Sequence, residues 1–146
     1  MTTTAALAVV AATGTTVIAA AIIVALRHRF TVVTVRGPSM QPALQPGDTL
    51  LARRTRGDTV RNGDVIILRV PVVPGESDRY TVVKRVAATA GDPIPAYLPP
   101  ATRPGTGLLP AGQLAVLGDN AASSADSRVW GLIPAGDVLA KVIRKL

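Results

Sequence analysis

Uncharged residues dominate the first part of the chain. The 22 residues from Ala5 to Leu26 include no charged side chain. As an α-helix, this run would be about 33 Å long, which is enough to span a bilayer core of roughly 30 Å. A cleaved signal peptide is the competing interpretation, but no basic residue precedes the run. The pattern predicts a transmembrane anchor within the N-terminal segment 1–29, and a buried core helix fits so long and uniform a run less well.

After this run the pattern changes to short apolar segments rich in Val, Ile, Leu and Thr, which are typical of strands. No helical periodicity of useful length follows Leu26. The sequence therefore predicts an all-β, antiparallel, barrel-like domain over residues 30–146, preceded by one transmembrane helix. Clusters of Gly, Pro and Asp separate the six predicted strands, which are 31–36, 48–53, 64–70, 80–86, 113–118 and 138–144.

One long segment between two predicted strands has an unusual composition. Residues 93–112 contain six Pro and three Gly. Proline lacks the N–H group that a central strand needs, so this segment is unsuited to the interior of a sheet. We expect an exposed excursion between strands here.

Composition limits the chemistry that is available to the protein. The chain of 146 residues has no Cys and a single His, His28. Disulfides, Cys-based zinc sites and thiol nucleophiles are therefore excluded, and a Ser-His-Asp triad is hard to assemble. We expect neither a metal nor a cofactor. His28 itself is a poor candidate base because it lies at the membrane end of the predicted anchor.

The charge balance predicts an acidic partner. Sixteen Lys and Arg residues against nine Asp and Glu give a net charge of +7, which suits nucleic acid or an anionic membrane. The most basic stretch, 53–61, lacks the interleaved aromatic residues of a nucleic-acid site. We therefore expect contact with anionic lipid and none with nucleic acid.

Two polar residues stand out as candidate catalytic residues. Ser39 follows a predicted strand and a Gly-Pro turn, so its hydroxyl can project into a cleft, although many turn serines only bond locally. Lys84 shares one face of its strand with Val82 and Val86. If that face is buried, desolvation lowers the pKa of the lysine, and its neutral amine could deprotonate a serine. The pattern alone favours the other interpretation, a lysine on the solvated face of an edge strand.

Three segments in order, GPSMQPALQPGD (37–48), VVKRVAATAGD (82–92) and LGDNAASSADSRVWGLIPAGDVLAKV (117–142), resemble the type I signal peptidase family. The resemblance covers nearly everything from Val32 to the C-terminus, in a minimal form with a single anchor. Members of this family are membrane peptidases that use a serine/lysine dyad. The resemblance implies a serine endopeptidase that removes signal (leader) peptides from exported precursor proteins. It also implies a cell-membrane location with the catalytic domain on the extracytoplasmic side.

Carried over position by position, the resemblance makes Ser39 the nucleophile and Lys84 the general base. Ser124 matches a hydroxyl that orients the lysine, while Gly37 and Met40 join Ser39 in the oxyanion and substrate-binding region. Small substrate side chains are implied at the first and third positions before the cut. Structural support of the site is implied for Asp119, Asn120, Asp126 and Arg128. For Ser124, Asp126 and Arg128, turn capping or a surface ion pair is the alternative.

Several positions depart from the family pattern. Ala43 replaces a threonine, Ala88 and Ala90 replace a glycine and a proline, and Gly37 replaces a serine that helps to hold the oxyanion in some members. The three alanines leave open a catalytically silent membrane-tethered binding domain. The small size leaves open a dedicated maturation protease for one precursor in the same superfamily, because the excursion 93–112 stands where larger relatives insert an extra subdomain. Retention of both Ser39 and Lys84 argues against the silent form.

The charges next to the anchor conflict with the implied orientation. Arg27 and Arg29 follow the apolar run directly. The positive-inside tendency would put this end of the anchor in the cytoplasm, whereas the family resemblance implies the opposite side.

Overall fold

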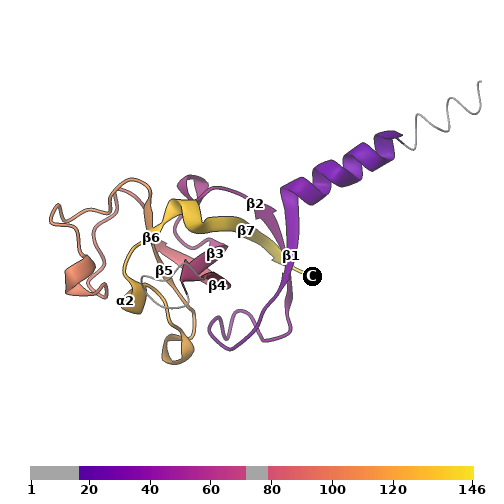
Figure 1. Cartoon of the computed structure of the whole chain (residues 1–146). Helices are drawn as coiled ribbons and strands as arrows, with labels where there is room; N and C mark the ends of the chain where they lie inside the picture. The colour runs from indigo at the N-terminus through magenta and orange to yellow at the C-terminus, as the bar shows by residue number, and fades with distance from the viewer. Residues whose placement is uncertain (1–16, 72–78) are drawn as a thin grey trace, which may run out of the picture.

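The computed structural model of the protein describes residues 17–71 and 79–146. A helix over 17–29, with all of its side chains exposed, leads directly into the first strand (Figure 1). Within the described residues, no helix is long and apolar enough to cross a membrane. Residues 5–16 of the predicted anchor lie outside the described residues, so the anchor stays a prediction.

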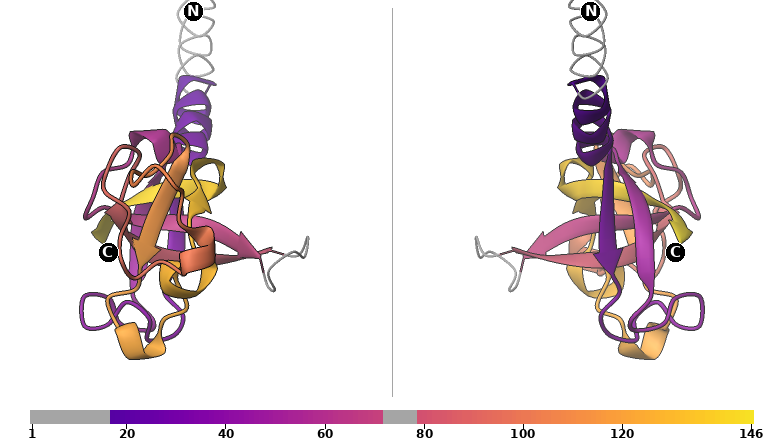
Figure 2. Two further views of the ribbon diagram at one scale, coloured as in Figure 1. Left: turned by 90° about the vertical axis from the view of Figure 1, so that its left-hand side faces the viewer. Right: turned by 90° about the vertical axis from the view of Figure 1, so that its right-hand side faces the viewer.

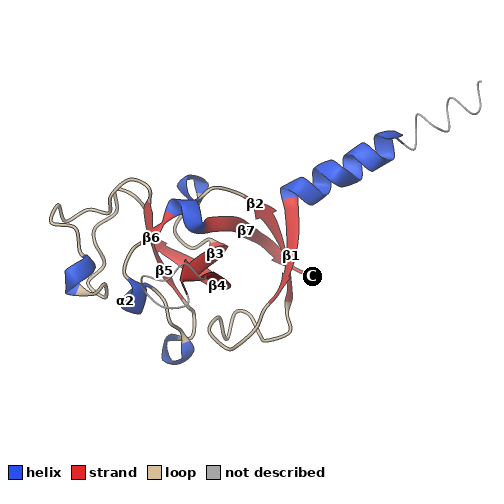
Figure 3. Cartoon of the chain, in the orientation of Figure 1, coloured by secondary structure: helices blue, strands red, loops and turns tan. Residues whose placement is uncertain are grey.

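Seven antiparallel strands form one sheet, in the order β1-β2-β7-β3-β4-β5-β6 (Figure 3). Each of the six predicted strands overlaps an observed one, so the β-dominated fold class is confirmed. The seventh strand, β6, spans two residues and is too short to leave an apolar pattern in the sequence. The strands are β1 (Phe30–Thr34), β2 (Thr49–Arg54), β3 (Val65–Pro71), β4 (Arg79–Ala88), β5 (Gln113–Leu117), β6 (Ile133–Pro134) and β7 (Val138–Lys145).

The predicted barrel-like closure of the sheet is wrong. β1 and β6 lie at opposite ends of the strand order and do not pair within the described residues, so the sheet is open. Register shifts on β2, β3 and β4 interrupt the ladders. Such irregularities bend a sheet without closing it. Figure 2 shows the β3–β4 hairpin reaching out past the other strands, and helix 17–29 pointing away from the sheet.

The core lies on both faces of β3. Ile66, Leu68 and Val70 pack on one side with residues of β4, β5 and β7, while Ile67 packs on the other side with Ala52 and Ala140. A strand that is buried on both faces reads as a continuous apolar run instead of an alternation. This explains the uninterrupted VIIL of the predicted strand 64–70.

Three Gly-Asp pairs form one recurring turn. Each glycine has a positive φ, and each aspartate carboxylate accepts a hydrogen bond from the backbone N–H three residues earlier. Glycine adopts positive φ without steric cost, and Asp stabilises such turns through this local bond. The turns lie before β2, before β3 and after β4, where they set the direction of the chain. The pairs are Gly47-Asp48, Gly63-Asp64 and Gly91-Asp92.

The Pro- and Gly-rich segment 93–112 folds against β4 and β5. Leu98 and Leu109 in this segment are fully buried. They pack on Ala88 of β4 and Ala115 of β5. Part of the segment is therefore a small core of its own, which its composition does not indicate.

Candidate active site

Lys84 lies on β4 and is only 3% exposed. The solvated edge strand favoured by the pattern alone is wrong, because β3 pairs with β4 along its length and β5 begins to pair at Arg85. Burial is the main cause that lowers the pKa of Lys84 below its ordinary value. The Asp126 carboxylate opposes this shift, and the Arg128 guanidinium adds to it. Burial in the sheet therefore makes Lys84 easier to deprotonate than an exposed lysine.

A chain of hydrogen bonds fixes the lysine amine. Nζ of Lys84 donates a bond of 3.0 Å to Oγ of Ser124, and this hydroxyl donates a bond of 2.8 Å to Oδ2 of Asp126. Ser124 lies in the loop after β5, directly after the short 3-10 helix η3 (Ala121–Ser123). The indole ring of Trp130 lies 6.0 Å from the same Nζ atom. The fold therefore brings Lys84 and Ser124 together from segments forty residues apart.

The fully buried Asp126 is the centre of this network. Its carboxylate accepts hydrogen bonds from the Arg128 guanidinium at 2.8 and 2.6 Å, and from the Gly118 N–H at 2.9 Å. Burial alone would raise the pKa of Asp126, but these bonds and the bond from Ser124 lower it to about 2. The residue also caps the short helix α2 (Ser127–Trp130) by accepting from the Arg128 N–H. Asp126 is therefore charged and fully hydrogen-bonded.

Ser39 lies in the turn after β1, half-buried. Gly37 has a φ of 79°, a conformation that favours glycine, and it reverses the chain just before Ser39. The carbonyl oxygen of Ser39 accepts a hydrogen bond of 3.0 Å from the N–H of Asn120, which ties this turn to the loop after β5. The next residue, Met40, is 1% exposed and packs against Leu50, so the turn is anchored in the core.

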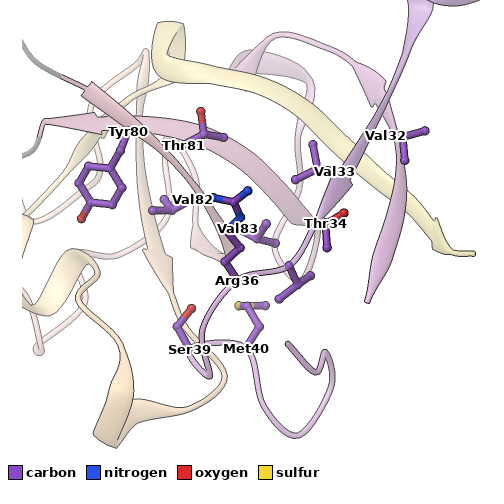
Figure 4. Close-up of a pocket in the computed structure, with 11 residues that line it drawn as sticks. Val32, Val33, Thr34, Arg36, Ser39, Met40, Tyr80, Thr81, Val82 and Val83 are labelled. Atoms are coloured by element: carbon purple, nitrogen blue, oxygen red, sulfur yellow. The ribbon is translucent and has the colours of Figure 1, made fainter. Parts of the chain in front are cut away.

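A cavity of about 670 Å³ opens beside Ser39 (Figure 4). Two continuous stretches line it, 32–36 from β1 and its following loop, and 80–83 from β4, together with Ser39 and Met40. Lys84 follows the second stretch directly in the chain. Within residues 17–71 and 79–146, no hydrogen bond joins Ser39 Oγ to Lys84 Nζ; the lysine bonds to Ser124 instead.

Gly118 is a residue of this site that sequence reasoning missed. A Cβ at this position would lie 2.5 Å from Cβ of Ser124 and 2.6 Å from the carbonyl oxygen of Ser39. No side chain larger than hydrogen fits between these two groups without displacing one of them. The available signal was a further Gly-Asp pair, Gly118-Asp119, which looks like another turn but serves close packing.

Asp119 and Asn120 support the same loop in different ways. The Asp119 carboxylate forms a two-pronged ion pair with Arg85 of β4, at 2.8 and 2.7 Å, while Asn120 contributes its backbone N–H to Ser39. Arg85 also donates to the carbonyl oxygen of Gly63. Because Arg85 directly follows Lys84, this strand contacts the loop after β5 through two consecutive side chains.

The structure combines an open antiparallel sheet with a buried lysine–serine–aspartate network and a cavity that a second serine lines. These features agree with the class indicated by the sequence resemblance, the membrane peptidases of the signal peptidase type. The chain matches the family described as "Signal peptidase, peptidase S26" over residues 7–97 and 95–145. It therefore belongs to the peptidase S26 family of signal peptidases.

Similar proteins carry two kinds of name. The chain is 35% identical to "Mitochondrial inner membrane protease subunit 1" of Schizosaccharomyces pombe over 118 residues, which cover 80% of this chain and 73% of that protein. It is 32% identical to the human protein of the same name, over 79% of this chain and 68% of the relative. The "Probable signal peptidase I-1" of Synechocystis is 29% identical over 148 residues, covering 81% and 73% of the two chains.

Proposed function

We propose that this protein is a membrane-bound serine endopeptidase that removes signal (leader) peptides from exported precursors, with Ser39 as nucleophile and Lys84 as general base. The observation that carries the proposal is the buried amine of Lys84, which bonds to Ser124, while Ser124 and the carbonyl oxygen of Ser39 both lie against Gly118. Membership of the S26 family supports the same chemistry. No cofactor or metal takes part in the proposed reaction.

The hydrogen bond to Ser124 suits a lysine that acts as a base. A neutral amine has two N–H donors and one lone pair. One donor is used by the Ser124 hydroxyl, which itself donates to Asp126 and so accepts from Lys84. The lone pair then remains available for the proton of Ser39. Catalytic hydrogen bonds often tighten only in the substrate complex, which fits the absence of a direct Ser39–Lys84 bond among the described residues.

Two free strand edges support an extended peptide substrate. Within the described residues, β1 pairs only with β2, and the stretch 80–83 of β4 pairs only with β3. Both stretches line the cavity next to Ser39. An extended segment of a precursor could add to such an edge through main-chain hydrogen bonds, while its side chains enter the cavity.

The proposed reaction has two stages. In the first, Lys84 takes the proton of the Ser39 hydroxyl, and the oxygen attacks the scissile carbonyl carbon. The lysine returns that proton to the leaving amine as the peptide bond breaks, which leaves an ester on Ser39. In the second, Lys84 removes a proton from water and the resulting hydroxide attacks the ester carbonyl. The bond to the Ser39 oxygen then breaks, the acyl part of the substrate leaves as a carboxylic acid, and Lys84 returns the proton to Ser39.

The oxyanion of each stage needs a hydrogen-bond donor. The backbone N–H of Ser39 donates to no group among the described residues and suits this role. Gly37 offers no hydroxyl where some family members have a serine, so we assign the oxyanion to main-chain donors of this turn.

We further propose a single-pass location in the cell membrane, with residues 30–146 on the extracytoplasmic side and anionic lipid in contact with the basic surface. Ser39 lies thirteen positions after Leu26. At roughly 3.3 Å per extended residue, the nucleophile lies at most about 43 Å from the end of the anchor. This limited distance from the bilayer suits a cleavage site that emerges from the membrane at the end of a precursor's own apolar segment. The relatives named inner membrane proteases support the membrane association in this proposal.

A dedicated maturation protease for one precursor is the second candidate. The chain matches relatives named inner membrane protease subunits as well as one named signal peptidase I, so similarity alone does not favour a general signal peptidase over this candidate. Cleavage of several unrelated signal-peptide precursors by the purified protein would exclude this second candidate.

The test of the dyad uses the purified full chain in detergent with a precursor bearing a signal peptide. Ser39→Ala and Lys84→Met should each lower kcat/KM by about a thousandfold or more, as expected for residues that act as one unit. The exposed Ser123→Ala and Lys145→Met serve as matched controls and should cleave normally. Full activity in either site variant would contradict the dyad, and loss of wild-type activity with a chelator would contradict a metal-free mechanism.

A further inference from the structure

Arg36 is the single charged side chain among the eleven described residues that line the cavity beside Ser39. It lies in the loop directly after β1, three positions before Ser39. In Figure 4 its guanidinium extends from this loop toward Val82 and Val83 of β4. The remaining lining is made of aliphatic side chains, hydroxyl groups, Tyr80 and Met40. A permanent positive charge therefore borders the space that the proposed substrate would occupy.

This guanidinium has no partner within the described part of the chain. No hydrogen bond or ion pair engages the Arg36 side chain there. By contrast, Arg85 and Arg128 are each held by a carboxylate through two bonds. A guanidinium presents a planar fork of donors that matches the two oxygens of a carboxylate. The Arg36 side chain is exposed, so its guanidinium is accessible to a carboxylate of a bound peptide.

We propose that Arg36 determines specificity by binding an Asp or Glu side chain of the precursor close to the scissile bond. This inference rests on the proposed peptidase function. Arg36 and Ser39 line the same cavity and are three positions apart, so their Cα atoms are at most about 11 Å apart, which equals about three residues of an extended peptide. The recognised carboxylate therefore lies within about three residues of the cut. Arg36 acts on substrate binding and is absent from the groups that shift the pKa of Lys84.

The first experiment measures binding without catalysis. A labelled precursor peptide, with Ala at the first and third positions before the cut, carries Asp, Asn or Lys at one other position within three residues of the cut. Fluorescence anisotropy reports its binding to the full-length Ser39→Ala variant in detergent. At the recognised position, Asp should bind about tenfold more tightly than Asn, as expected for a charge-assisted pair. Lys should bind more weakly than Asn.

Substitutions of the arginine should remove or reverse this preference. In Ser39→Ala combined with Arg36→Gln, the Asp and Asn peptides should bind equally. With Arg36→Glu, the Lys peptide should become the preferred ligand. The matched control is Arg54→Gln, which removes one exposed positive charge outside the cavity lining and should retain the Asp preference.

The second experiment follows cleavage by proteins that keep Ser39. Arg36→Gln should raise KM for the Asp peptide about tenfold and leave kcat and the pH profile unchanged, since the lost pair contributes to substrate binding. Selective binding of the Asp peptide without cleavage by the wild type would contradict the peptidase function. It would still support Arg36 as a binding site for a carboxylate. Equal kcat/KM of the wild type for the Asp and Asn peptides would agree with the peptidase function but overturn the proposed role of Arg36 in specificity.

Two further outcomes would overturn the proposal. One is an Asp preference that survives in Arg36→Gln. The other is equal binding of all peptides together with weaker association of Arg36→Gln with vesicles of anionic phospholipid, which would assign this arginine to lipid headgroups instead.

Discussion

At the scale of single residues, Asp126 and Arg128 act on Lys84 in opposite directions although they are paired with each other. The carboxylate raises the pKa of the lysine, and the guanidinium lowers it. Burial lowers this pKa most, so the neutral amine becomes available at a lower pH than for an exposed lysine. The pair therefore adjusts the base while it holds Ser124 in position.

This balance predicts a pH profile with a defined sign. Activity needs the neutral amine, so kcat/KM should rise as pH increases through the lowered pKa of Lys84 and then level off. Asp126→Asn removes the group that raises this pKa, so the midpoint should move to lower pH. Arg128→Gln removes a group that lowers it, so the midpoint should move to higher pH.

Measurement of kcat/KM from neutral to alkaline pH checks both directions. Asp48→Asn is the matched control, because this carboxylate pairs with Lys145 and is not among the groups that shift the pKa of Lys84. Its midpoint should equal that of the wild type. Midpoints that move the same way in both site variants would contradict the opposing electrostatic roles.

At the scale of elements, the loop after β5 joins every part of the site. It supplies Ser124 to the lysine on β4, Asp119 to the neighbouring Arg85, and the N–H of Asn120 to the turn of Ser39. Gly118 lies where these contacts converge. The relative position of the proposed nucleophile and base therefore depends on how closely this loop approaches β1 and β4.

Gly118→Ala should disrupt that approach. The added methyl group would overlap Ser124 and the Ser39 carbonyl oxygen, and overpacking of this kind costs about 1–3 kcal/mol of folding free energy. Cleavage should fall more steeply than stability, because both site serines are displaced. Thermal unfolding and kcat/KM are the two measurements.

Gly136→Ala is the matched control for this substitution. A Cβ at Gly136 meets no atom within 4 Å, and its φ is not positive. Stability and activity should therefore stay close to those of the wild type. Wild-type activity in Gly118→Ala would show that the loop accommodates the methyl group and would refute its role as a spacer.

At the scale of the whole molecule, helix 17–29 leads straight into β1, which is one of the two strands that line the cavity. The proposed anchor and the substrate cavity are therefore connected by a single short stretch of chain. This continuity would keep Ser39 near the bilayer surface. The basic residues Arg27 and Arg29 lie at the same junction, so their location relative to the membrane decides which compartment the site faces.

A reporter fused after Leu146 tests this orientation. We expect the reporter on the extracytoplasmic side, where signal peptides are removed from exported proteins. Protease accessibility in intact cells and in permeabilised cells is the measurement. A reporter that is protected in intact cells and digested only after permeabilisation would support the positive-inside orientation and overturn the secretory assignment.

The sequence by itself determined the strands, because short apolar runs between turn residues are a local signal, and all six predicted strands overlap observed ones. It also identified the family through the three motifs around Ser39, Lys84 and Asp126, which the family match confirms. The three Gly-Asp turns were equally predictable, since their hydrogen bonds span only three residues.

Only the tertiary structure decided which groups surround the candidate catalytic residues. A period of two shows that Lys84 and Val86 share a face, but it does not say whether that face is buried, which depends on partner strands distant in sequence. For the same reason the sequence left the strand order, the open sheet and the crowding at Gly118 undetermined. The position of Arg36 in the cavity, with no partner among the described residues, likewise emerges only when β1 and β4 come together. Local patterns encode elements, whereas desolvation and charge pairing arise from contacts between elements.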